Sequence, residues 1–74
     1  MSRMSARFVG SKLGLSASDV YEIWEKIGLV VKDKWGWWDL TPLGRQHGGR
    51  ISSGSHTPVP TFDFDVVREL MRKK

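Results

Sequence analysis

The residues best suited to binding a partner at the protein surface are tryptophans and lysines that lie close together in the stretch LVVKDKWGWWDL, residues 29 to 40. Lys32 and Lys34 precede Trp35 and Trp37 there. Aromatic rings stack on bases or sugars and ammonium groups meet phosphates, so this combination is typical of nucleic-acid contact. Exposed tryptophans are equally typical of anchors in protein interfaces. A third interpretation is that one of these rings packs on the C-terminal helix.

Groups suited to catalysis or metal binding are few. His47 and His56 lie among glycines and serines without a neighbouring pair of carboxylates, and the chain has no cysteine. A zinc site or an activated nucleophile needs such groups held together. The segment GGRISSG lacks the Gly-Lys-Ser/Thr ending of a phosphate-binding loop, so we interpret it as a linker. We therefore expect no enzymatic activity, no metal and no cofactor.

Length and composition predict one small domain over residues 1 to 74, because 74 residues can build only one core. No apolar run approaches the roughly 20 residues that span a bilayer, and MSRMSARF lacks the apolar block of a secretory signal. Together with the absence of cysteine, this predicts a cytoplasmic protein without a membrane partner. Twelve Lys and Arg against eight acids give a net charge of +4, which is compatible with a polyanionic partner.

A short helix is expected from Ser5 to Leu13. Ser5 is a suitable N-cap, and Val9 and Leu13 lie one helical turn apart. Gly14 ends this helix because glycine readily adopts a left-handed conformation, and Leu15 then folds back over the last turn.

A second helix is expected from Ala17 to Gly28, since Ser16 and Asp19 approximate a capping box. Its apolar stripe consists of Val20, Ile23, Trp24 and Ile27. When this stripe faces the core, the exposed face is centred on Ser18, Glu22 and Glu25, flanked by Tyr21 and Lys26. Two carboxylates oppose docking in a phosphate-lined groove, so conventional major-groove insertion is disfavoured.

The remaining sequence predicts a hairpin, a stub, a loop and a last helix. Two strands meet near Asp33 and Lys34, with Trp38 and Leu40 facing inward and the other two tryptophans at the surface. Thr41 and Pro42 open a short helix. Residues 48 to 60 are predicted to be a flexible loop. The last helix is capped by Asp63 or Asp65 and docks through an apolar set: Phe64, Val67, Leu70 and Met71.

The turn LGLS, followed by Val20 and Ile23 six and nine positions after its glycine, predicts a helix-turn-helix, and the hairpin adds a wing. Over residues 6 to 44 the chain resembles the winged-helix modules of bacteriophage antirepressor and phage regulatory proteins. The matching positions are Leu13, Gly14, Ser16, Ala17, Ile27, Gly28, Leu29, Trp38, Leu40, Thr41 and Gly44. Trp35 and Trp37 depart from that pattern. The expected fold class is mainly α with a small β-hairpin: a winged helix-turn-helix with an extra C-terminal helix.

The resemblance implies a DNA-binding module that regulates transcription in the cytoplasm of a bacterial or phage-infected cell. We expect double-stranded DNA as partner, with contacts from Lys12, Ser16, Ser18, Tyr21, Lys26, Lys32, Lys34, Trp35, Trp37, Arg45 and Arg50. The alternative is a protein-interaction module that docks a protein partner through Glu22, Glu25, Trp35 and Trp37.

Overall fold

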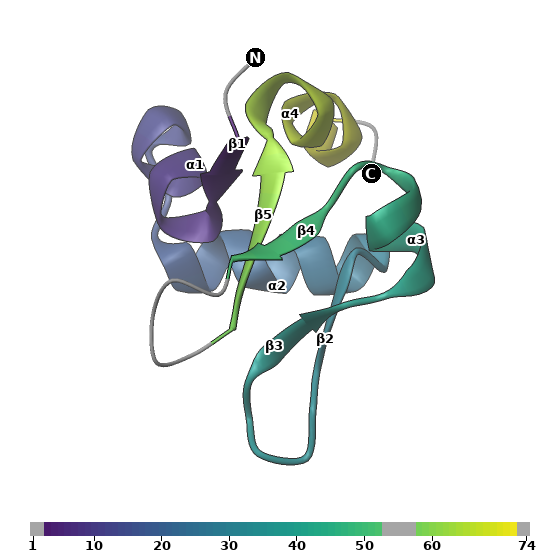
Figure 1. Cartoon of the computed structure of the whole chain (residues 1–74). Coiled ribbons are helices and arrows are strands. Elements are labelled where there is room, and N and C mark those ends of the chain that lie inside the picture. Colours follow the sequence, from purple (N-terminus) through teal and green to yellow (C-terminus); the bar gives the residue numbers. More distant parts are fainter. Residues whose placement is uncertain (1–2, 53–57, 73–74) are drawn as a thin grey trace.

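Helices and two small antiparallel sheets form a mixed α/β domain in the computed structural model, which describes residues 3–52 and 58–72 (Figure 1). In chain order the elements are β1 (Arg3–Ser5), α1 (Ala6–Leu13), α2 (Ala17–Ile27), β2 (Val30–Lys32), β3 (Trp38–Leu40), α3 (Pro42–Gln46), β4 (Arg50–Ser52), β5 (Val59–Asp63) and α4 (Phe64–Arg72). No helix in these two ranges has the length and apolar character needed to cross a bilayer.

Local capping signals set the boundary between α1 and α2. Gly14 is the C-cap of α1 with φ of 74°, and the Leu15 N–H donates to the carbonyl of Gly10 at 2.8 Å. Ser16 and Asp19 form the capping box of α2, with each side chain accepting the other's backbone N–H at 3.1 and 3.2 Å. These predictions are confirmed. Leu13, however, is exposed, because the buried side of α1 consists of Ala6, Val9 and Gly10.

A three-stranded antiparallel sheet of order β1-β5-β4 corrects the expected fold class, which contained only one hairpin besides its helices. Its register pairs Met4 with Phe62 and Ile51 with Pro60. The last pair between β1 and β5 joins Ser5 to Thr61. Pro60 lies beyond this pair, where β5 needs no hydrogen bond to β1, so its lack of an N–H is tolerated there.

The expectation of a flexible loop over residues 48–60 is wrong at residues 50–52 and 59–60, which lie in β4 and β5. These short strands are flanked by glycine, serine and proline, and they depend on pairing with each other and with β1 at the start of the chain. The residues of a short strand give little indication of the distant strand with which it pairs. Residues 53–57, the rest of that predicted loop, lie outside the described residues.

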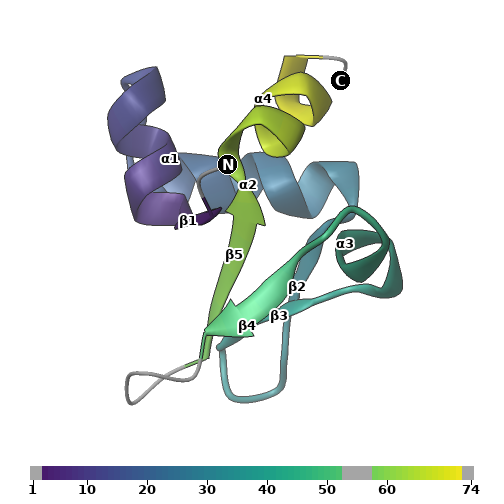
Figure 2. The same cartoon turned by 45° about the horizontal axis from the view of Figure 1, so that its top comes forward.

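The core lies where α2, α4 and the strands meet. Val20 and Trp24 of α2 are fully buried, and the Trp24 ring meets the ring of Phe62 edge-on at 4.8 Å between centroids. Val67 of α4 is fully buried, while Phe64, Leu70 and Met71 pack against the same cluster, which confirms the predicted docking of the last helix. Both views show the β2–β3 hairpin extending from the end of the molecule opposite α1 and α4 (Figures 1 and 2).

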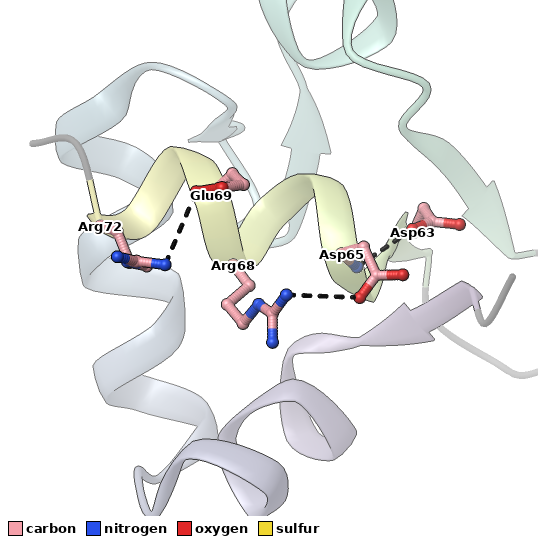
Figure 3. Close-up of polar contacts among 5 residues, drawn as sticks. All are labelled: Asp63, Asp65, Arg68, Glu69 and Arg72. Carbon is pink, nitrogen blue, oxygen red and sulfur yellow. Dashed lines mark hydrogen bonds and ion pairs between the residues drawn. The ribbon is translucent and has the colours of Figure 1, made fainter.

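Polar contacts at the surface of α4 stay within the helix and its cap (Figure 3). Asp63 provides the cap, since its Oδ1 accepts the N–H of Asp65 at 3.0 Å. Arg68 lies 3.8 Å from Asp65, and Arg72 lies 3.9 Å from Glu69. Exposed pairs of this kind contribute only about 0–1 kcal/mol. They do, however, leave the charges of α4 locally balanced.

Candidate functional site

The tip of the β2–β3 hairpin is built around Asp33. Its Oδ1 accepts the N–H groups of both Trp35 and Trp37 at 2.9 Å. Its own N–H donates to the carbonyl of Trp37 at 2.9 Å, and the N–H of Gly36 donates to the carbonyl of Asp33 at 3.0 Å. Gly36 has φ of 85°, a conformation that favours glycine. These four hydrogen bonds fix a short loop. Any residue with a side chain at position 36 would strain the backbone of this loop.

This turn holds the ring of Trp35 in solvent, with 70% of the residue's surface exposed. The ammonium Nζ of Lys34 lies 4.6 Å from the centroid of that ring. Cation–π contacts at exposed sites contribute about 0.5–1 kcal/mol. The structure thus brings Lys34 and Trp35 together as one exposed pair, and the predicted exposure of Trp35 is confirmed.

The outer face of the hairpin carries Trp37 together with Val31, a residue that was not identified from sequence. The register pairs Lys32 with Trp38 and Val31 with Asp39, so the face opposite Trp38 contains Val31 and Trp37 as diagonal neighbours. Trp37 is 44% exposed and Val31 is 47% exposed. Once the register is known, the strand alternation identifies Val31 as part of this apolar surface.

The inner face of the hairpin packs on α2 through a series of aromatic contacts. Trp38 stacks on Tyr21 with 4.8 Å between ring centroids and 8° between planes, and Tyr21 meets Trp24 edge-on at 5.9 Å. The Nζ of Lys32 lies 5.2 Å from the Trp38 ring. Lys32 is therefore beside Trp38, and the expectation that it lies beside Trp35 and Trp37 is wrong.

Tyr21 contributes to this packing and is not a free side chain at the α2 surface. Its ring is half-buried between the two tryptophans it contacts, and burial raises the pKa of its hydroxyl above the usual value of 10.0. Any DNA contact by Tyr21 would be made by the part of its side chain that the stack with Trp38 leaves exposed. The stack fixes the hairpin relative to α2.

The base of the hairpin is joined to α2 and α3 by Thr41. Its hydroxyl donates to the carbonyl of Gly28, the C-cap of α2, and accepts the N–H of Gly44 at 2.9 Å. Its backbone N–H donates to the carbonyl of Leu29 at 3.1 Å. The predicted N-cap role of Thr41 is thus confirmed, and the contact to Gly28 adds a link between three elements.

The outward face of α2 carries the acids expected from its periodicity. Glu22 and Glu25 are exposed, as is Ser18. Neither glutamate takes part in the salt bridges formed between residues of the described ranges. Ser16 is exposed too, although its hydroxyl already accepts the Asp19 N–H. This face presents carboxylates that form no salt bridge among the described residues, which opposes contact with phosphates.

The other predicted contact residues lie on separate elements. Lys12 belongs to α1, with its Nζ 5.5 Å from the ring of Phe64, whereas Lys26, Arg45 and Arg50 are exposed on α2, α3 and β4. Because α1 lies at the end opposite the hairpin tip, Lys12 does not share a surface with Trp35 (Figure 2).

The predicted residues therefore divide into an exposed group on the hairpin and others spread over the molecule. No cluster of three or more His, Asp or Glu side chains suited to a metal ion occurs in residues 3–52 and 58–72. His47 is half-buried at the end of α3, and His56 lies outside the described residues. In comparisons with known proteins, no family model, no curated protein and no solved structure matches this chain.

Proposed function

We propose that this chain is a DNA-binding module of the winged helix-turn-helix class with a regulatory role. In this proposal α1 and α2 are the two helices of the motif, and the β2–β3 hairpin is the wing. The observation that carries it is the exposed group of Lys34, Trp35 and Trp37 on a hairpin that extends from the rest of the domain (Figure 1). Phosphates attract the ammonium group, while rings contact sugars or bases.

The charge near the hairpin tip supports an anionic partner. Lys34 and Lys32 both contact rings, and neither forms a salt bridge to a carboxylate of the described residues. Of the two acids of the hairpin, Asp33 directs an oxygen at two backbone N–H groups, and Asp39 is exposed on the outer face opposite Val31. By contrast, Arg68 and Arg72 of α4 have acidic partners one turn away. The whole chain carries a net charge of +4.

The acidic face of α2 limits how DNA approaches. Glu22 and Glu25 are exposed and would face phosphates if α2 entered a groove along its outward side. In the proposed complex the hairpin therefore makes the main contact with DNA. Exposed cations such as Lys26 and Arg50 contact the phosphate backbone of the DNA.

A protein-interaction module is the second candidate. The exposed pair of Val31 and Trp37 is an apolar surface on the outer side of the hairpin, and apolar rings of this kind anchor protein interfaces. Glu22 and Glu25 would then face a basic partner. Loss of partner capture in Trp37→Ala, with folding retained, would favour this candidate.

The proposal is tested by titrating a fluorescent duplex and following anisotropy at about 50 and 200 mM salt, a range over which phosphate-driven binding weakens steeply. Lys34→Gln is compared with Arg7→Gln, which removes the same charge from the exposed side of α1. We expect binding that weakens with salt, and a salt slope reduced by about one in Lys34→Gln only. Absence of binding at the lower salt concentration would exclude the DNA-binding proposal.

A further inference from the structure

Trp35 is the most exposed large apolar residue in the described part of the chain, at 70%. Its backbone N–H is held by Asp33, its neighbour Gly36 closes the turn, and Lys34 lies over its ring. Burial of apolar surface contributes about 25 cal/mol of stabilisation for each Å² removed from water, and the exposed part of this ring does not receive that contribution. The turn thus fixes the backbone that carries this ring, so little backbone freedom is lost when a ligand covers it.

The chemistry around this ring fits a nucleobase with its phosphate. A base stacks on an indole face, and an ammonium group within the same pair of residues meets the adjoining phosphate. The Nζ of Lys34 lies over one face of the Trp35 ring, 4.6 Å from the centroid, so a base would stack on the other face with the ammonium group at the same point of the hairpin. A negatively charged partner also matches the absence of any salt bridge to Lys34 within the described residues.

Stacking on Trp35 requires a base whose face is free. In a fully paired duplex the faces of the bases are covered by their neighbours, and only an unpaired or extruded base offers one. Deep insertion of the domain into a groove is opposed by the exposed carboxylates of Glu22 and Glu25. The hairpin tip, in contrast, projects from the domain and can reach an unpaired base without insertion of α2 into a groove (Figure 1).

We propose that Trp35 stacks on an unpaired base and that Lys34 contacts its phosphate, so that the protein binds DNA containing unpaired bases more tightly than fully paired DNA. This inference rests on the proposed DNA-binding function and specifies the kind of DNA that the same surface recognises. Trp35 is the stacking residue and Trp37, which is less exposed, flanks it.

The test compares two fluorescent probes of one sequence, a fully paired duplex and the same duplex with a short unpaired bubble. Wild type, Trp35→Ala, Trp35→Phe and Phe8→Ala are titrated at one salt concentration, with circular dichroism as a check of folding. Phe8 is the matched control, because this residue is 61% exposed and lies on α1, away from the hairpin. Trp35→Phe keeps an aromatic face and removes the indole.

We expect wild type and Phe8→Ala to prefer the bubble, and Trp35→Ala to bind it at least about fivefold more weakly and to lose the preference. Trp35→Phe should retain most of the preference. Equal affinity of wild type for both probes, or a preference that persists in Trp35→Ala, would overturn the stacking inference while DNA binding stands. Absence of binding to both probes would overturn the proposed function and the inference together.

Discussion

Replacing Thr41 by valine removes one hydroxyl that joins α2, the hairpin and α3. Two contacts are lost: the N-cap of α3, in which the hydroxyl accepts the Gly44 N–H at 2.9 Å, and the donation to the Gly28 carbonyl. Loss of an N-cap costs typically about 1 kcal/mol. An unsatisfied, partly buried carbonyl costs about 1–3 kcal/mol. Since valine keeps nearly the same shape, we expect Thr41→Val to lower the free energy of unfolding by about 2–4 kcal/mol.

Thermal and denaturant unfolding, followed by circular dichroism, measure this loss. For a domain of this size about 2 kcal/mol corresponds to a fall in Tm of about 8–16 °C. Thr41→Ser is the matched control because it keeps the hydroxyl and loses only a methyl group. A Thr41→Val variant as stable as Thr41→Ser, within about 0.5 kcal/mol, would refute the assignment of this hydroxyl as the link between the elements.

Two further substitutions test the packing around the hairpin. Burial raises the pKa of Tyr21, so the folded state holds this proton more tightly than the unfolded chain. The free energy of unfolding should therefore fall as pH rises above about 10 and through the folded pKa, and Tyr21→Phe should lack this component. Tyr21 is the chain's one tyrosine, so tyrosinate absorbance reports its titration directly; parallel losses of stability in both proteins would contradict the reasoning. In Gly44→Ala, helix propensity favours alanine by about 1 kcal/mol, but the added Cβ would meet the backbone oxygen of Leu29. We expect a net destabilisation of about 1–3 kcal/mol in urea unfolding, and a midpoint at or above wild type would show that the backbone moves aside freely.

The helices of this fold could be predicted because their ends carry local signals. Gly14, Ser16, Asp19 and Gly28 each act on the backbone within a few residues, and all four have the predicted conformations or contacts. The three-stranded sheet could not be predicted in the same way. Its central strand β5 pairs with a strand at the other end of the chain, and no short segment records that pairing.

The candidate site was predictable in part for a related reason. Alternation along β3 was enough to assign Trp38 to the inner face and Trp37 to the outer face, and both assignments are confirmed. The position of Lys32 depends on the register between the strands, which the loop from Asp33 to Trp37 sets. The sequence alone does not give this register, so it did not show that Lys32 lies beside Trp38. Whether the exposed rings bind DNA stays a prediction.

The pairing of β1 with β5 also determines when the protein can fold during its synthesis. Arg3 pairs with Asp63, and Ser5 pairs with Thr61, so the first strand has no β5 partner until residues 61–63 have left the ribosome. Contacts between residues so far apart in sequence close a large loop and slow folding. The α1–α2 unit, whose caps are local, can form its turn early. The three-stranded sheet, and with it the contact of Phe62 with Trp24, can form only after residues 59–63 have been made.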